Sequence, residues 1–339
     1  MKAICLNRQR KVEMLDLPKP ELSGDDDVLI RVTSAGICTA DLEIIAGTHP
    51  FATPGNILGH EFGGIVEEIG ASVSGLSVGD KVTVDPVCAC GHCHACAIGK
   101  PNVCANLRTM GVHRDGGFCE YVCVDAGRVY RYADQSISEK LVGLAEPYSI
   151  GAQSNSRAGV AARDTVLVIG AGAIGLCALQ DAKRRGARAI ITDVLEPRLR
   201  RAEAMGADMC IVSKKADMGG IIHAATGGVG PDVIILTVSD PLQLEACLRY
   251  VSAGGRIVVV GLNSRPSAVS QAALVAKEIT LCGSRLSSRL FGYVLEGIDE
   301  GSYRPDLLAS HFFPPDRFLD AVDLIRREPE STCRVVLTF

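Results

Sequence analysis

The sequence is poor in aromatic residues and contains no tryptophan. Aromatic residues make up 4% of the 339 residues, whereas proteins that bind single-stranded nucleic acid stack the bases on aromatic side chains. Lys and Arg number 35 against 39 Asp and Glu, so the net charge is −4, and no basic stripe is present. A nucleic acid is therefore not expected as the main partner.

Long apolar runs are also absent. No run reaches the ~18 residues that a membrane span needs. Residues 1–20, MKAICLNRQRKVEMLDLPKP, carry charge throughout and lack the apolar core of a signal peptide. Because disulfides persist mainly in oxidising compartments, the 14 cysteines are expected to be reduced thiols in a cytoplasm. We predict a cytoplasmic protein that does not associate with a membrane.

The length predicts two domains, since single cores stop growing near 250–300 residues, roughly. Residues 1–150 begin with short strands separated by Gly and Pro, which favour a compact β-barrel-like domain. From about residue 164, strands alternate with helical patterns, so 151–287 is predicted to form an α/β domain with a doubly wound parallel sheet. Residues 288–339 depart from this alternation, and the closing RVVLTF is expected to pair with the first domain.

Cysteine, in contrast, is concentrated in one short stretch, CGHCHACAIGKPNVC. Its pattern is C-x2-C-x2-C-x7-C, formed by Cys90, Cys93, Cys96 and Cys104. Four thiolates on a tightly turning loop suit a closed, tetrahedral structural Zn²⁺ site. A disulfide ladder is the alternative, and it requires an oxidising compartment.

A glycine loop indicates a dinucleotide site. Gly170, Gly172 and Gly175 form G-A-G-A-I-G directly after the strand TVLVIG and open a helix. In this context the loop, including Ala173 and Ile174, would bring backbone N–H groups to a pyrophosphate. A simple strand–helix turn is the alternative.

The residues that would choose the dinucleotide follow the next strand. Asp193 ends it, and a carboxylate there accepts hydrogen bonds from ribose hydroxyls and repels a 2′-phosphate, which favours NAD over NADP. Arg198 could stack on the adenine or could be a solvated helix residue. We add Gly261 and Ser284, at the ends of later strands, as candidate cofactor-binding residues.

A second metal site is predicted from three separate segments. Cys38 lies in AGICTADLE, His60 and Glu61 in LGHEFGGIV, and Glu146 in LAEPYSIG. A buried His-Glu pair in an apolar stretch needs a partner. A thiolate, an imidazole and carboxylates that leave one position open make a plausible catalytic zinc site. The open position would receive a substrate hydroxyl, whose ionised form the metal stabilises while hydride leaves.

The chain closely resembles the zinc-dependent medium-chain alcohol and polyol dehydrogenases over essentially its whole length. The resemblance rests, in this order, on GICTAD, GHEFGG, CGHCHACAIGKPNVC, GVHRDGGFCEYV, LAEPYSIG and GAGAIG. It implies a GroES-like catalytic domain with a structural zinc lobe at about 86–108, a Rossmann domain that binds NAD, and an active site between them. It also implies catalytic zinc ligands at Cys38, His60, Glu61 and Glu146. A glutamate at position 146 resembles the branch of this family that contains the sorbitol, threonine and sugar-acid dehydrogenases.

Two departures from the family pattern concern the proton relay. Ala40 stands where the family usually has Ser or Thr, and Glu43 where it often has His. We expect the substrate proton to leave through water and a carboxylate, Glu43 or Glu61, although Glu43 could be a solvated helix residue. His49 and Arg285 are candidate substrate residues; Arg285 could equally contact the cofactor or solvent.

The sequence thus predicts an NAD-dependent zinc dehydrogenase acting on a secondary alcohol of a polyol, sugar acid or similar small polar substrate. An L-threonine 3-dehydrogenase-like activity is one alternative. A catalytically impaired regulator with the same fold is an alternative of another class, to which Ala40 lends support. The resemblance also implies a homodimer or homotetramer.

Overall fold

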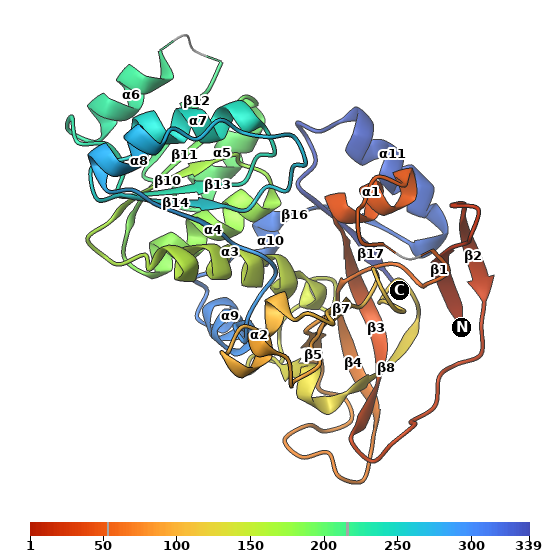
Figure 1. Ribbon diagram of the computed structural model, residues 1–339. Helices are drawn as coiled ribbons and strands as arrows, with labels where there is room; N and C mark the ends of the chain where they lie inside the picture. The colour runs from red at the N-terminus through yellow and green to blue at the C-terminus, as the bar shows by residue number, and fades with distance from the viewer. Residues whose placement is uncertain (53, 215–216) are drawn as a thin grey trace. The chain divides into compact units, whose positions relative to one another are not determined.

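The computed structural model describes residues 1–52, 54–214 and 217–339 (Figure 1). The chain divides into two compact units. The first comprises 1–146, 288–300 and 308–339, and the second comprises 147–287 and 301–307. The short segment 301–307 thus belongs to the second unit, although it lies within the region predicted to return to the first.

The first unit is built on a seven-stranded sheet. Its strand order is β16-β17-β3-β4-β5-β9, and β8 pairs with β3 off this path. A hairpin of β1 and β2 and a second small sheet of β6 and β7 complete its β-structure. The strands are β1 Lys2–Leu6, β2 Val12–Asp16, β3 Asp27–Ile37, β4 Glu61–Ile69, β5 Lys81–Val84, β6 Val87–Cys88, β7 Arg108–Thr109, β8 Tyr121–Asp125, β9 Val129–Arg131, β16 Ala309–Phe313 and β17 Arg334–Thr338.

Helices of this unit lie around the sheet. They are α1 Thr39–Ala46, α2 His94–Ala97, α9 Phe291–Asp299 and α11 Phe318–Arg327. The core joins side chains of strands, helices and loops, and the ring of Phe118, before β8, lies 5.6 Å from that of Phe318 in α11. Close packing of β3 on β4 depends on Gly64, where an added Cβ would lie 2.0 Å from the Arg31 carbonyl oxygen. A side chain at that position would force the two strands apart.

The closing segment RVVLTF forms β17 in the sheet of the first unit. β17 pairs antiparallel with β3, with Val335 opposite Ile37. The residues Val335, Val336 and Leu337 are fully buried. A segment distant in sequence therefore forms an inner strand of the first unit.

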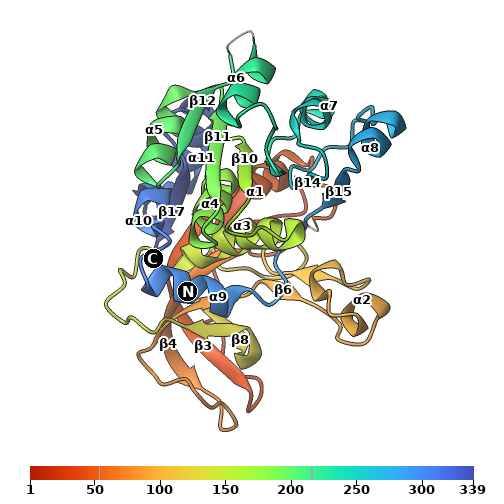
Figure 2. The ribbon, with the colours of Figure 1, turned by 90° about the vertical axis from the view of Figure 1, so that its left-hand side faces the viewer.

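The second unit contains a six-stranded parallel sheet of order β12-β11-β10-β13-β14-β15. Its strands are β10 Thr165–Ile169, β11 Arg188–Asp193, β12 Met209–Val212, β13 Val233–Leu236, β14 Arg256–Val259 and β15 Thr280–Gly283. Its helices are α3 Ala145–Ala158, α4 Ala173–Arg184, α5 Glu196–Ala204, α6 Met218–Ala225, α7 Pro241–Tyr250, α8 Gln271–Lys277 and α10 Pro305–Leu308. Helices lie on both faces of the sheet (Figures 1 and 2).

The predicted α/β fold class is confirmed. Strands β10 and β13 are parallel neighbours, and the direction in which successive strands are added to the sheet reverses between them. Ligands of such sheets bind at the carboxyl ends of the strands beside this reversal. Among the described residues, no helix is both long and apolar enough to cross a membrane.

Candidate active site

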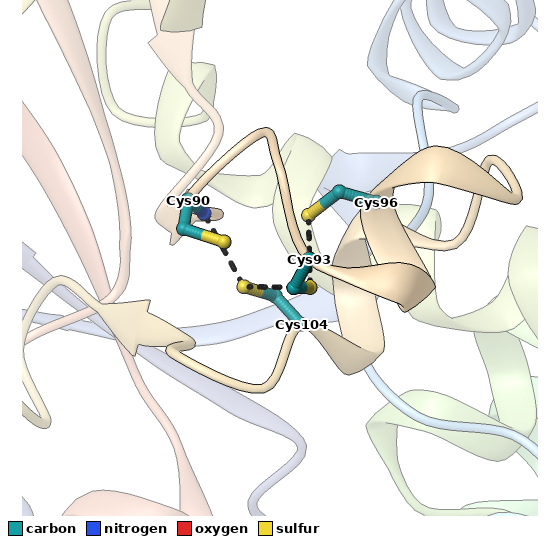
Figure 3. Close-up of side chains that lie close together, drawn as sticks. All are labelled: Cys90, Cys93, Cys96 and Cys104. Atoms are coloured by element: carbon teal, nitrogen blue, oxygen red, sulfur yellow. Dashed lines mark hydrogen bonds between the residues drawn. The ribbon is translucent and has the colours of Figure 1, made fainter.

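The four clustered cysteines come together in space. Their sulfur atoms all lie within 4.8 Å of one another. Cys93 Sγ lies 3.5 Å from that of Cys96 and 3.7 Å from that of Cys104 (Figure 3). Backbone N–H groups of Cys90 and Asn106 point at Cys104 Sγ, at 3.2 and 3.3 Å. Such N–H groups stabilise thiolates, the form that binds a metal.

The titration of these thiols fits a bound cation. The backbone N–H of His92 lowers the pKa of Cys90 to about 6. Burial raises the pKa of Cys96 to about 11. Burial therefore favours the neutral thiol of Cys96 unless a bound cation balances the charge of its thiolate. The donor set suits a structural Zn²⁺ ion with no open position.

Asp85 is a buried carboxyl group at the base of this lobe, directly after β5. Its Oδ1 accepts the Val87 N–H at 2.9 Å. Burial raises the pKa of Asp85 to about 6, against the opposing effects of that N–H and of Arg128. Because the pKa in the folded state exceeds the unfolded value, the neutral carboxyl stabilises the fold at low pH. This stabilisation is lost as the pH rises through about 6.

Asp85→Asn should therefore stabilise the protein at pH 8 more than at pH 5. The expected difference between the two pH values is about 1–3 kcal/mol, because one pKa unit corresponds to about 1.4 kcal/mol. Thermal unfolding followed by circular dichroism at both pH values measures it. Asp125→Asn, at an exposed carboxylate, is the control, and an identical pH dependence in Asp85→Asn and wild type would contradict the prediction.

The second predicted metal set is assembled by the pairing of β3 with β4. Gly36 near the end of β3 lies opposite Glu61 at the start of β4. Cys38 follows β3 as the N-cap of α1, and His60 precedes β4. The antiparallel pairing therefore brings ligands that are 22 positions apart to the same edge. One ligand atom from each of Cys38, His60 and Glu61 lies within 4.8 Å of the others.

Asp41 supports this set and was not predicted from the sequence. Its side chain is fully buried, and its Oδ2 accepts the Cys38 N–H at 2.8 Å. Its Oδ1 lies 3.5 Å from His60 Nδ1. Burial opposes protonation of His60, but the Asp41 carboxylate raises the pKa of His60 well above its usual value. A carboxylate at Nδ1 orients the ring so that Nε2 can bind a metal.

Arg334 supports the set from β17 and was also missed. Its Nε lies 3.0 Å from Glu61 Oε2, and both side chains are almost completely buried. It also donates to the Ile37 carbonyl at 3.0 Å. An added Cβ on Gly36 would lie 2.4 Å from Glu61 Oε2. Two features of the sequence could have indicated these residues. Asp41 is an acid three residues after Cys38, and Arg334 is a single basic residue at the start of an apolar strand.

Glu146 lies near this set but outside the group of three. It stands in the first turn of α3 and is 4% exposed. Burial, together with the Glu61 carboxylate, raises the pKa of Glu146 to about 8, whereas His60 and Arg334 oppose this shift. The structure therefore places Glu146 within electrostatic reach of Glu61 and His60.

The residues present fit a catalytic zinc ion. Neither carboxylate oxygen of the buried Glu61 has a hydrogen-bond partner among the described residues. The ion pair that the described part of the chain gives this carboxylate is with Arg334. A cation here would be held by a thiolate, an imidazole and a carboxylate oxygen. This donor set is of the kind that binds zinc while leaving a position for a substrate.

The glycine loop has the strand–turn–helix context that a dinucleotide requires. Gly170 follows β10 with a φ of 101°. Gly172 is the N-cap of α4, and Ala173 and Ile174 are its first residues. An added Cβ on Gly175 would lie 1.8 Å from the Gly170 carbonyl oxygen. The helix N-terminus is thus held against the end of the strand, as pyrophosphate binding requires.

Asp193 and Arg198 lie on one cavity of the second unit. The cavity has a volume of about 500 Å³, and Gly170 also lines it. Asp193 Oδ2 accepts the Ala171 N–H at 2.8 Å, and Oδ1 accepts the Leu195 N–H at 2.9 Å. Arg198 lies 3.7 Å from the Asp193 carboxylate. Asp193 therefore also braces the glycine loop, which the sequence did not predict.

Two family models match the chain. Residues 24–134 match the alcohol dehydrogenase GroES-like domain, and residues 173–299 match the zinc-binding dehydrogenase domain. The starvation-sensing protein RspB of Escherichia coli K12 is 35% identical over 341 residues, covering 100% of this chain and 99% of that protein. The chain belongs to the zinc-type medium-chain alcohol dehydrogenase family.

Two relatives of this dehydrogenase have names that state a substrate. The L-galactonate-5-dehydrogenase of E. coli K12 is 33% identical over 301 residues, or 88% of this chain and 87% of the relative. The sorbitol dehydrogenase of Bacillus subtilis is 35% identical over 271 residues, which cover 78% of this chain and 76% of that enzyme. The chain is thus an oxidoreductase related to enzymes that act on alcohols.

Solved structures of similar dehydrogenases contain nicotinamide cofactors. RspB from E. coli CFT073, in complex with NADH, has a TM-score of 0.93 and 34% identity, covering 100% of this chain and 99% of that one. A zinc-binding dehydrogenase from Sinorhizobium meliloti 1021, bound to NADP, has a TM-score of 0.90 and 28% identity, with the same coverage. The family therefore binds zinc and nicotinamide dinucleotides.

The other predicted site residues of this dehydrogenase are scattered. Glu43 is exposed on α1, and His49 is half-buried just beyond that helix. Gly261 packs against the segment that follows β13, since an added Cβ would lie 2.5 Å from the Val238 carbonyl oxygen. The Ser284 N–H binds the Val259 carbonyl oxygen at 2.9 Å. Arg285 is exposed in the second unit.

Proposed function

We propose that this dehydrogenase transfers hydride between NAD and a secondary alcohol of a polyol or sugar acid, with zinc at Cys38, His60 and Glu61. The observation that supports this most strongly is the convergence of these three side chains within 4.8 Å. The three residues come from two strand ends, and neither buried carboxylate oxygen of Glu61 has a hydrogen-bond partner within the described ranges. Glu146, buried beside them, would complete or exchange into the ligand set.

The chemistry divides between the bound groups and the side chains. When bound, zinc supplies a Lewis acid for the substrate oxygen and NAD supplies a hydride acceptor. The alcohol carbon loses hydride, the hydroxyl loses its proton, and a carbonyl forms. Asp41 orients the His60 ring, and Arg334 restrains Glu61 on one side. The proton leaves through a carboxylate, Glu43 or Glu61, and exposure of Glu43 gives it direct exchange with water.

NAD rather than NADP is proposed because Asp193 lines the cavity at the glycine loop. Asp193→Asn should raise the KM for NAD about 10-fold and lower that for NADP. The amide no longer repels a 2′-phosphate, and Arg198 on the same cavity can pair with it. Asn keeps an acceptor for the Ala171 N–H, so the loop is retained. Initial rates with both cofactors measure this, and an unchanged preference would contradict it.

A substrate panel tests the proposed activity. Sorbitol, galactitol, L-galactonate, D-gluconate and L-threonine would each be offered with NAD, and NADH absorbance would be followed. We expect oxidation of polyols or sugar acids, together with one zinc ion at each of the two sites by metal analysis. Zinc confined to the cysteine lobe, with no oxidation of any compound, would instead support a regulator of the same fold.

We also propose that the enzyme works in a cytoplasm as a homodimer or homotetramer. None of the cysteines that the structure describes forms a disulfide, including those within 4 Å of another sulfur. Reduced thiols are typical of a reducing compartment. Light scattering of the purified protein measures the number of subunits.

A further inference from the structure

The loop GVHRDGGF, residues 111–118, belongs to the motifs of the family resemblance, but the proposed function gives it no role. It lies between β7 and β8 of the first unit. Its glycines and its final phenylalanine pack closely on the backbone of Gly59. Since Gly59 directly precedes His60, the loop can determine the direction in which the chain enters that metal ligand.

Hydrogen bonds join the segment before the metal ligand to this loop. The Gly117 N–H donates to the Gly59 carbonyl at 2.8 Å, and the Phe118 N–H donates to the Leu58 carbonyl at 2.8 Å. The Leu58 N–H in turn donates to the Ile4 carbonyl at 3.1 Å. The segment is therefore bonded both to the loop and to β1.

Gly59 has no side chain, and its backbone adopts a conformation that other residues rarely take. Its φ is 90°. Glycine has more backbone freedom than any other residue, so the neighbours of Gly59 must restrict the chain here. An added Cβ would lie 2.1 Å from Cδ1 of Phe118 and 2.5 Å from its Cε1. The ring of Phe118 thus occupies the volume that a side chain on Gly59 would need.

Two glycines of the loop restrict the carbonyl group of Gly59. An added Cβ on Gly111 would lie 2.5 Å from the Gly59 carbonyl oxygen, and one on Gly116 would lie 2.1 Å from the same atom. These close approaches limit movement of the peptide group that joins Gly59 to His60. The Phe118 ring limits movement of the same residue at its α-carbon.

The ring of Phe118 is itself held firmly. Its side chain is fully buried, and the ring of Phe318 lies 5.6 Å away at an angle of 59°. The Phe118 carbonyl accepts the Ile4 N–H at 2.8 Å. Because close-packed interiors transmit strain, a ring held in this way imposes its position on the residue that it contacts.

The contacts of the His60 ring depend on the direction of its backbone. Its Nδ1 lies 3.5 Å from Asp41 Oδ1, and the ring shares the group of three with Cys38 and Glu61. Any rotation of the peptide before His60 would move the ring relative to these partners. Loss of a residue that orients a metal ligand typically lowers metal affinity about 10–100-fold.

We propose that Phe118 is a positioning residue of the catalytic metal site. Its ring takes the place of the side chain that Gly59 lacks, and it thereby fixes the direction of His60. Phe118 acts through Gly59 and contacts no reacting atom in this role. This inference rests on the proposed function, since it takes His60 as a ligand of the catalytic metal.

Leucine variants of the two paired rings separate positioning from packing. Phe118→Leu and Phe318→Leu each replace a buried ring by a smaller side chain and break the same aromatic pair. Similar losses of thermal stability are therefore expected. Phe118→Leu also empties the space at the α-carbon of Gly59, because the three atoms nearest to an added Cβ there belong to Phe118.

Titration with Co²⁺ measures the effect on the metal site. The catalytic site is emptied with a chelator, and absorption from charge transfer between the Cys38 thiolate and Co²⁺ reports rebinding; Cys38→Ser provides the blank for the cysteine lobe. Phe118→Leu should raise the dissociation constant about 10-fold to 100-fold, and Phe318→Leu less than about threefold. An equal rise in both variants, or no rise in Phe118→Leu, would overturn the inference.

Methionine variants keep the comparison possible if Phe118→Leu does not fold. Phe118→Met and Phe318→Met would then be titrated in the same way, because the unbranched methionine side chain fills irregular gaps in a core. Phe118→Met should again weaken Co²⁺ binding more than Phe318→Met does. The reverse order, or no difference between the two, would refute the positioning role.

A second measurement does not depend on the catalytic metal. Nitrogen-15 labelling of histidine reports the His60 ring by NMR in the protein without that metal, and His60→Gln assigns its signals. We expect Phe118→Leu to shift or broaden them and Phe318→Leu to leave them in place; unchanged signals in Phe118→Leu would contradict the inference. Failure of the wild type to bind Co²⁺ outside the cysteine lobe would instead count against the proposed function, and the NMR comparison would still decide whether Phe118 fixes His60.

Discussion

Cys38→Ser should lower kcat by about 10³-fold or more and leave the chain with zinc only in the cysteine lobe. The substitution removes the thiolate from a set that provides just three side chains within 4.8 Å. Even loss of a residue that only orients a ligand costs about 10–100-fold in metal affinity or activity. Loss of the Lewis acid itself removes several kcal/mol of transition-state stabilisation, and about 4 kcal/mol corresponds to 10³-fold.

Metal analysis and steady-state kinetics on the same preparation measure this outcome. Cys123→Ser is the matched control, because Cys123 is a partly buried cysteine of β8 outside both sets. It should keep both metals and full activity. Retention of two zinc ions and of normal kcat in Cys38→Ser would remove Cys38 from the ligand set.

Cys93→Ser should release the zinc of the cysteine lobe and lower the melting temperature by roughly 10 °C. Cys93 Sγ contacts both Cys96 and Cys104, and it accepts the Ala105 N–H at 3.5 Å. Between the two strands of its small sheet, the lobe contains only α2 and a short 3-10 helix. Such a segment buries few apolar side chains, so the metal must supply much of its stability. The melting temperature of a domain of this size falls by about 2–4 °C for each kcal/mol of stability lost. A loss of about 3–5 kcal/mol therefore lowers it by roughly 10 °C.

Calorimetry, zinc analysis and limited proteolysis between β6 and β7 follow this loss. Cys88→Ser is the sharpest control, because Cys88 lies two residues before the cluster but outside the group of four. It should retain zinc. If Cys88→Ser releases zinc as well, Cys88 exchanges into the site; if Cys93→Ser retains it, the lobe is not a four-thiolate centre.

The parts of the fold with strong local patterns could be predicted from the sequence. Strand–helix alternation after residue 164 predicted the parallel sheet, and the glycines at 170, 172 and 175 predicted its first strand–helix turn. The isolated apolar segment RVVLTF predicts a return to the first unit, where it pairs with β3. In these segments, the residues themselves determine the local geometry.

The supporting residues of the metal set could not be predicted in the same way. Asp41 reads as an ordinary acid in the first turn of a helix, and only the fold shows that it also faces His60. Arg334 lies 273 positions after Glu61, so no local pattern links the two. Glu146 has the right residue type, yet the position of α3 keeps it outside the group of three. Each of these depends on long-range packing.

The place of β17 in the sheet has a consequence for biosynthesis. Domains tend to fold as they leave the ribosome, the N-terminal parts first. Residues 334–338 are translated after the entire second unit, yet they fill an inner position of the first unit's sheet and deliver the counter-charge of Glu61. On the nascent chain, the sheet of the first unit therefore lacks β17 until after the second unit has been translated in full. During that interval Glu61 lacks its guanidinium partner, so early capture of a metal ion would help to hold the unfinished sheet together.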